Sequence, residues 1–252
     1  MPPQTSKKKR APARPSRPWI PVAIVGGVAV LAVALVIAFA NTGGNSNGSS
    51  SNLGAAATPG PTHSAPQNGA TIGSDSAPVT MIEYFKFDCP HCADFASKVA
   101  PTLEKDYVDT GKVRIEFRPL AVQGDLLNAS EAALAAGEQG RFWEYYDLVF
   151  ANQSRGFSTS DLKDYAAALG LDTKAFNSVL DSGKYKDQIV NGTNEALNVG
   201  LQSTPTFFFI KTSDLPNLQV PYTGQTKVMG VQLTNPVAPF KAAIDPILAA
   251  IQ

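Results

Sequence analysis

The chain of 252 residues contains only two cysteines, and both lie in the segment Cys89-Pro90-His91-Cys92. A disulfide framework needs several cysteines at scattered positions, and a closed structural zinc site needs four ligands from Cys and His. The only other histidine is His63, which lies in a stretch of small and polar residues. We therefore predict that the two cysteines form a dithiol/disulfide pair. A small structural staple, or half of a metal site, is the alternative.

The segments on either side of the cysteines predict a strand, a helix and a second strand. Residues 79–87 are rich in β-branched and aromatic side chains, which is typical of a strand buried on both faces. Residues 93–107 have helical spacing with a kink expected at Pro101, and residues 113–118 alternate as a strand does. This βαβ unit places the cysteines at the strand-to-helix turn. One helical turn separates them, so the two sulfurs can form a bond.

The first 40 residues have the pattern of a membrane anchor. Residues 1–18 contain six Lys and Arg and no acid, and residues 19–40 contain no charge. About 20 apolar residues span a bilayer, and cationic residues stay on the cytoplasmic side. We expect a basic cytoplasmic tail at 1–18, one transmembrane helix at 19–40 that holds the chain in the cell membrane, and an extracytoplasmic remainder. A cleaved secretory signal is the alternative, although its apolar region would be unusually long.

The remainder of the chain is predicted to consist of a linker and one domain. Residues 41–68 are mostly Asn, Gly, Ser, Ala, Pro and Thr, which predicts a flexible linker. Residues 69–252 are long enough for one domain with a sizeable core. Because six of the 21 Lys and Arg lie in residues 1–18, the exported part has 15 of them against 21 Asp and Glu. No basic patch indicates nucleic-acid binding.

Residues 125–200 are almost entirely helical in pattern. Ser158 and Asp172 are expected N-caps, and Gly170 is an expected C-cap. The aromatic residues Phe142, Trp143, Tyr145 and Tyr146 have the helical spacing of packing residues, which we favour over an aromatic binding site. We expect helices at 126–139, 141–152, 160–169, 173–181 and 185–201, strands at 206–211 and 227–233, and a closing helix at 239–251.

The chain contains the segments FDCPHCADF at 87–95, GRFWEYYDLVF at 140–150, LKDYAAALGLD at 162–172 and STPTFFFI at 203–210. These four segments resemble the DsbA-like branch of the thioredoxin superfamily. The resemblance implies an α/β thioredoxin-like fold for residues 69–252, with a central mixed sheet, flanking helices and a helical insertion at about 121–200. It also implies thiol:disulfide oxidoreductase activity, in which the Cys89–Cys92 disulfide is the redox group and no other cofactor or metal is needed. We expect a monomer.

The cysteine turn has the chemistry that disulfide exchange requires. Cys89 falls at a helix N-terminus, where unpaired N–H groups and the helix dipole favour a thiolate. Pro90 fits the first helical turn, because its missing N–H costs no hydrogen bond there. His91 can add a hydrogen-bond donor or a positive charge beside the sulfur, and Cys92 is the second thiol. We expect Cys89 to be the nucleophile.

Three further residues complete the predicted site. The resemblance implies that Pro205 is cis and lies against the disulfide, with Thr204 offering its backbone to an extended client by strand addition. Related sequences commonly carry Gly where this chain has Ser203. Glu83 lies in the first strand, where a buried carboxyl has a raised pKa and can exchange a proton with a departing thiol. The alternative for Glu83 is a side chain that faces solvent.

The sequence therefore predicts an enzyme that donates its disulfide to exported client proteins with free thiols, through a mixed disulfide at Cys89. By resemblance, a membrane partner of the DsbB-like or vitamin K epoxide reductase-like type would reoxidise it. A reductase or isomerase on the same scaffold is an alternative, and it would require a higher Cys89 pKa. A metal carrier that binds copper(I) or zinc through the two cysteines is the third interpretation.

Overall fold

The chain is divided into two units, residues 1–49 and residues 50–252. The structure, a computed structural model, describes Gly60 and residues 62–217, 226–229 and 236–251, all of which belong to the second unit. None of the helices in this described part is both long and apolar enough to span a bilayer. The transmembrane helix expected at 19–40 lies outside the described residues.

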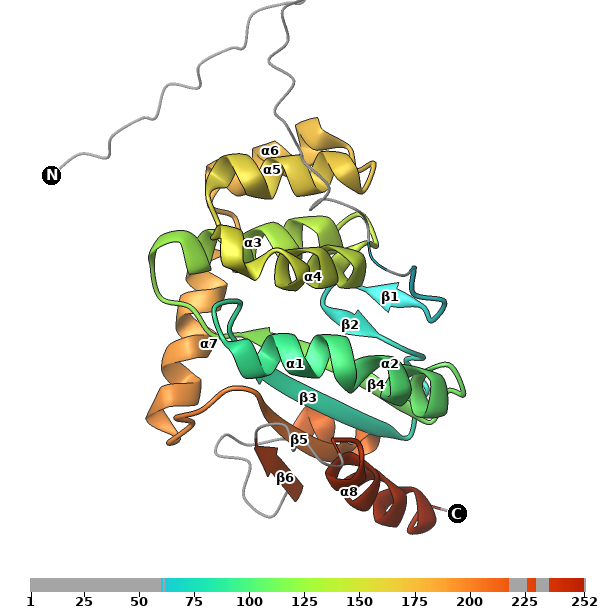
Figure 1. The fold of residues 1–252 in the computed structure, drawn as a ribbon. Coiled ribbons are helices and arrows are strands. Elements are labelled where there is room, and N and C mark those ends of the chain that lie inside the picture. The colour runs from blue at the N-terminus through green and yellow to red at the C-terminus, as the bar shows by residue number, and fades with distance from the viewer. Residues whose placement is uncertain (1–59, 61, 218–225, 230–235, 252) are drawn as a thin grey trace, which may run out of the picture. The chain divides into compact units, whose positions relative to one another are not determined.

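A mixed sheet of six strands forms the centre of the described part (Figure 1). The strand order is β1-β2-β4-β3-β5-β6. Strands β3 and β4 are parallel, as the predicted βαβ unit requires, and every other neighbouring pair is antiparallel. The strands are β1 (Gln67–Asn68), β2 (Thr71–Ile72), β3 (Val79–Phe85), β4 (Val113–Pro119), β5 (Thr206–Lys211) and β6 (Thr226–Met229).

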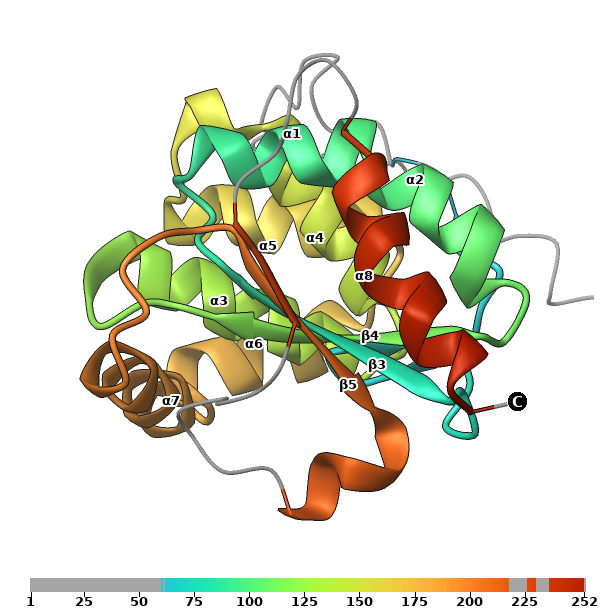
Figure 2. The ribbon, with the colours of Figure 1, turned by 90° about the horizontal axis from the view of Figure 1, so that it is seen from below.

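Strand β3 is buried on both faces, as its composition predicts. Because successive side chains alternate, Met81 and Phe85 enter the larger hydrophobic cluster on one face, and Ile82 and Tyr84 enter a second cluster on the other. Figure 2 shows three helices on one side of the sheet and one on the other: α1 (Pro90–Lys98), α2 (Ala100–Leu103) and α8 (Ala238–Ala249) against α7 (Lys186–Asn198). Glu83 therefore shares the face that α1 covers.

The helix that follows the cysteines is broken earlier than a simple kink at Pro101. Helix α1 (Pro90–Lys98) ends before Val99, and α2 (Ala100–Leu103) begins directly after it. Proline cannot donate the helical hydrogen bond and its ring crowds the preceding turn, which explains the break. A π-helical turn, η2 (Glu104–Val108), continues α2.

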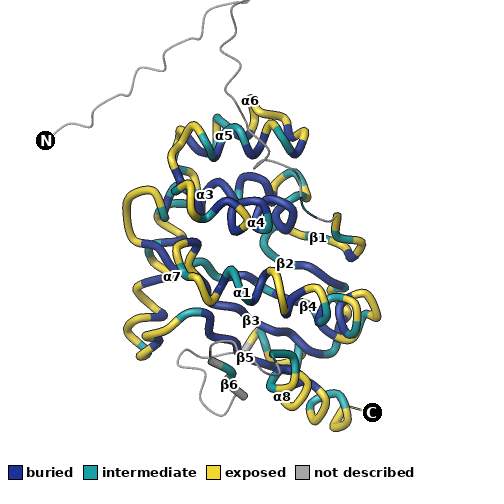
Figure 3. Tube along the Cα trace, in the orientation of Figure 1, coloured by how far each residue is buried: buried dark blue, intermediate teal, exposed yellow. Residues whose placement is uncertain are grey.

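The chain between β4 and β5 forms five α-helices, at the places where helical periodicity predicts them. Ser158 and Asp172 accept hydrogen bonds from the amides at the start of α5 and α6, which confirms both expected N-caps. Figure 3 shows α3 and α4 largely buried, with exposed residues on the outer faces of α5 and α6. The helices are α3 (Gly124–Gly137), α4 (Phe142–Ala151), α5 (Thr159–Ala168), α6 (Thr173–Ser182) and α7 (Lys186–Asn198).

The N-terminal edge of the domain differs from the expectation. Residues 62–68, expected as the end of a flexible linker, pack on the domain: Ala65 is buried, and β1 pairs with β2 through Gln67 and Asn68. A boundary at residue 69 is therefore too late in the chain. At the other end, β6 begins at Thr226, one residue before the strand expected at 227–233, and continues to Met229; residues 230–233 lie outside the described part.

Candidate active site

Cys89 is the N-cap of α1, with extended backbone angles of φ −85° and ψ 116°. Its carbonyl oxygen accepts hydrogen bonds from the amides of Cys92 and Ala93, at 3.1 and 3.2 Å, which start the helix. Pro90 stands in the first turn as predicted, and His91 is exposed. Both cysteines carry free thiols: Cys89 is half-buried and Cys92 is fully buried beneath it. One thiol is thus accessible to a partner and the other is not.

The two thiols differ in acidity. A hydrogen bond with Cys92 is the largest influence on the Cys89 pKa and lowers it. Burial opposes this effect, and hydrogen bonds with the side chain of Thr204 and with the backbone of Cys92 and His91 add to it. Together they lower the pKa of Cys89 to about 5. Burial, the hydrogen bond with Cys89 and the nearby Glu83 carboxyl raise the pKa of Cys92 far above that of a free thiol. At neutral pH Cys89 is the thiolate and Cys92 is the thiol.

The fold brings the loop before β5 against this pair. The Thr204–Pro205 peptide is cis, as the resemblance implies, and Pro205 is buried. In its protonated form the Cys89 thiol donates a hydrogen bond to the carbonyl oxygen of Thr204 at 3.2 Å, although 115 positions separate the two residues. Ser203 accepts a hydrogen bond at its carbonyl from the Thr206 hydroxyl at 2.7 Å. The loop thus holds one backbone carbonyl next to the reactive sulfur.

Glu83 lies beneath the cysteines and is fully buried, so the solvent-facing alternative is wrong. Its Oε1 accepts a hydrogen bond from the hydroxyl of Tyr146 at 3.3 Å, and its Oε2 has no partner within the described part of the chain. Burial raises the pKa of Glu83; the hydrogen bond from Tyr146 opposes this, and Cys89 adds to it. The carboxyl therefore holds its proton more readily than a free glutamate does and can exchange that proton with a neighbouring group.

Comparison with known proteins agrees with this geometry. A family model described as thioredoxin matches residues 65–213, which is more than half of the chain. The chain belongs to the thioredoxin family. Within the family it is similar to alpha-DsbA1 of Wolbachia pipientis, with 27% identity and a TM-score of 0.63 over 72% of this chain and 91% of that one.

Two further relatives of this thioredoxin-family chain are named for different activities, one for disulfide bond formation and one for ion transport. Over 147 residues it is 26% identical to a probable disulfide bond formation protein D of Bacillus cereus, covering 55% of this chain and 68% of that protein. Over 139 residues it is 37% identical to the Na(+)/H(+) antiporter NhaA 3 of Salinispora tropica, covering 54% of this chain but 21% of the antiporter. The chain thus spans about a fifth of the antiporter's length, so the match gives no reason to assign the antiporter's activity to this chain.

The thioredoxin domain also contains a buried ion cluster that sequence reasoning missed. The His63 imidazole is 5% exposed and lies between two carboxylates, with Nδ1 at 2.8 Å from Glu104 Oε2 and Nε2 at 3.1 Å from Asp147 Oδ2. The Trp143 ring packs edge-on against it. Burial alone would lower the pKa of His63, but the hydrogen bonds to Asp147 and Glu104 outweigh it and raise this pKa to about 10. A doubly protonated imidazole can donate to both carboxylates.

Through this cluster, the segment that contains His63 contacts two helical elements. Glu104 comes from the π-helical turn η2, and Asp147 comes from α4, one position after Tyr146. No local signal in the sequence indicates this role, because His63 stands among uncharged residues and its partners follow 41 and 84 positions later. The cluster and the candidate active site thus share helix α4.

Proposed function

We propose that this chain is a thiol:disulfide oxidoreductase that acts as an oxidase outside the cytoplasm and donates the Cys89–Cys92 disulfide to exported client proteins. The observation that carries the proposal is the half-buried Cys89 at a helix N-terminus, with its pKa lowered to about 5 beside a buried thiol. Stabilising the Cys89 thiolate stabilises the reduced form of the pair. The corresponding disulfide is then a strong oxidant, which favours transfer to clients over reduction of them.

The proposed exchange proceeds in two balanced steps. A client thiolate attacks the Cys89 sulfur; a client–Cys89 bond forms, the Cys89–Cys92 bond breaks, and Cys92 takes up the electron pair and a proton from Glu83. A second client thiolate attacks the client sulfur of this mixed disulfide and releases Cys89 as a thiolate. Two electrons pass from the client to the protein, and the Thr204 carbonyl pairs with the extended client backbone.

The proposal includes the location and the return path of the enzyme. The basic residues at 1–18 and the apolar run at 19–40 support a single-pass anchor with an extracytoplasmic catalytic domain. A membrane protein of the DsbB-like or vitamin K epoxide reductase-like type would reoxidise the pair, which needs no further cofactor. Protease added to intact cells tests the location, because it should degrade the domain without cell lysis.

The redox equilibrium with glutathione tests the direction of the reaction. We expect a reduction potential closer to about −120 mV, as for DsbA, than to about −270 mV, as for thioredoxin. We also expect the oxidised protein to oxidise a reduced two-cysteine peptide, with no transfer by Cys89→Ser. A potential near that of thioredoxin, together with a Cys89 thiolate midpoint above about 7, would support the reductase alternative instead.

A further inference from the structure

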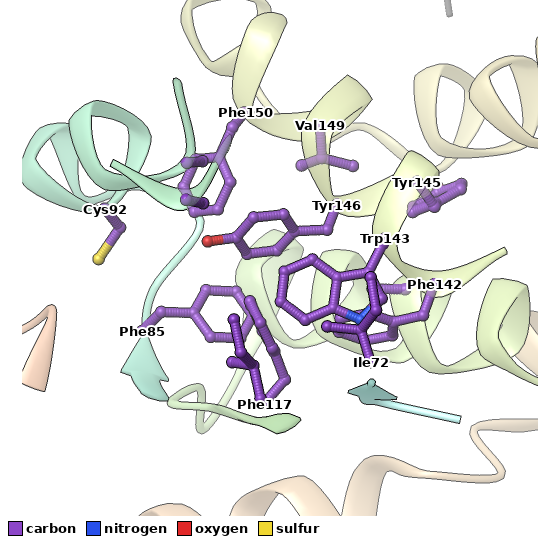
Figure 4. Packing of buried hydrophobic residues seen from close by; sticks show 14 of the residues in the cluster. Ile72, Phe85, Cys92, Phe117, Phe142, Trp143, Tyr145, Tyr146, Val149 and Phe150 are labelled. Carbon is purple, nitrogen blue, oxygen red and sulfur yellow. The ribbon is translucent and has the colours of Figure 1, made fainter. Parts of the chain in front are cut away.

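Tyr146 connects the helical insertion to the buried acid of the candidate active site. Its ring is fully buried on α4, and its hydroxyl donates to Glu83 Oε1 at 3.3 Å. Figure 4 shows this side chain crossing the aromatic cluster, with the hydroxyl directed toward the side on which Cys92 lies. Phe85, Phe117 and Phe150 pack around the ring and fix its position.

Tyr146 orients the Glu83 carboxyl, because the other described side chains around this carboxyl form no hydrogen bond with it. The neighbouring strands present Phe117 of β4 and Phe207 of β5 opposite Glu83, and neither can donate a hydrogen bond. The titratable groups that face the Glu83 carboxyl are Cys89 at the N-cap of α1, Cys92 in α1 and Tyr146 in α4. Of these, within the described part of the chain, only Tyr146 is hydrogen-bonded to the carboxyl.

We propose that Tyr146 is a positioning residue that holds the Glu83 carboxyl for proton exchange with Cys92. The proposal rests on the proposed function and assigns a part of it to the helical insertion. A hydroxyl that donates to Oε1 leaves Oε2 as the oxygen that carries the acid proton. The same hydrogen bond stabilises the carboxylate after the proton has left, because hydrogen bonds to charged groups are the stronger ones.

The hydrogen bond affects the two directions of exchange differently. When a client reduces the pair, Cys92 leaves as a thiolate and Glu83 acts as an acid. When the pair is reoxidised, the Cys92 thiol attacks the mixed disulfide at Cys89, and its proton passes to the Glu83 carboxylate, which acts as a base. The group that leaves Cys89 takes the electron pair. Loss of the hydrogen bond from Tyr146 should lower the share of Glu83 that is present as the carboxylate base, and it should leave the protonated acid populated.

The test compares Tyr146→Phe with Tyr145→Phe in the full-length protein. Tyr145 is the matched control, because it is equally buried on the same helix and its hydroxyl donates to the Leu162 carbonyl at 2.8 Å, away from Glu83. A carbon-13 NMR titration of the Glu83 carboxyl should show a midpoint about one pH unit higher in Tyr146→Phe and unchanged in Tyr145→Phe. Below the shifted midpoint, reoxidation by oxidised glutathione should slow about tenfold, while oxidation of a reduced peptide stays within about twofold.

A second variant, Glu83→Gln, separates positioning from packing. If Tyr146 acts through the carboxyl, Tyr146→Phe should change the reoxidation rate of the wild-type protein and leave the rate of the Glu83→Gln variant unchanged. An equal effect in both backgrounds, or an unchanged Glu83 midpoint in Tyr146→Phe, would overturn the inference. Failure of the proposed function looks different: the wild-type protein would then transfer no disulfide, whatever the NMR titration shows.

Discussion

Replacing His63 with alanine should strongly destabilise the folded domain, although His63 is remote from the cysteines in sequence. The substitution removes the cation between Glu104 and Asp147, whose side chains are only 16% and 20% exposed. The two carboxylates would then face each other without a partner. Breaking a buried ion pair by removing one member costs about 3–5 kcal/mol.

The pKa of His63 provides an independent magnitude. The difference between 6.5 and about 10 corresponds to an upper limit of about 5 kcal/mol of stabilisation from protonation. Burial raises the pKa of Asp147 despite the hydrogen bond from His63, so desolvation of that carboxylate offsets part of the gain. We therefore expect His63→Ala to lower the free energy of unfolding by about 3 kcal/mol at pH 6.

Urea denaturation of the reduced full-length protein, followed by circular dichroism, measures this loss. Lys98→Ala is the control, because it breaks the exposed pair with Asp94 on α1 and should cost less than about 1 kcal/mol. Because the pKa of His63 is raised in the folded state, protonated His63 stabilises the fold fully at a pH below its unfolded pKa of 6.5. This stabilisation is lost as the pH rises through about 10. The difference between wild type and His63→Ala should therefore shrink over this range. A loss below about 1 kcal/mol, or a difference that stays constant from pH 6 to 10, would refute the reasoning.

Two further predictions concern the cysteine pair and a helix cap. Cys92→Ala should raise the Cys89 pKa from about 5, because the hydrogen bond with Cys92 is its largest cause; titration of the thiolate absorbance measures it, and an unchanged midpoint would contradict this account. Asp172→Ala should lower the free energy of unfolding by about 1 kcal/mol, since the Asp172 carboxylate accepts from the amides of Lys174 and Ala175 at the start of α6. Ser178→Ala, on the exposed face of the same helix, should change stability by less than about 0.5 kcal/mol in the same urea assay.

Local patterns in the sequence were sufficient for most elements of the fold. Strand β5 has the bounds that its composition predicts, and the helices of the insertion lie within a few residues of their expected positions. The prediction was weaker where two signals compete, as at Pro101. There the helical spacing continues, but the missing N–H divides the helix into α1 and α2. Residues 62–68 differ from the predicted flexible linker. Their composition is typical of a linker, but the residues that stabilise their packing are distant in the sequence.

In the candidate site, too, the sequence predicts some features and leaves others to the tertiary structure. Cys89, Pro90, His91 and Cys92 form a motif whose position at a helix N-terminus follows from the adjacent strand and helix patterns. The resemblance supplied Thr204 and Pro205, and the structure places the Thr204 carbonyl at 3.2 Å from the Cys89 sulfur. That relation required knowledge of how β5 lies beside β3, which the periodicity of either strand does not contain.

The sequence by itself determined the strands from β3 onward, the helices of the insertion and the presence of one redox-capable pair, because periodicity, caps and the cysteine spacing act over one or two turns of chain. Only the tertiary structure decided that Tyr146 reaches Glu83 and that His63 lies between Glu104 and Asp147. These contacts join side chains that are 41 to 84 positions apart. Their free energy comes from burial of polar groups that must find partners, and packing of the whole domain decides which partners are within reach.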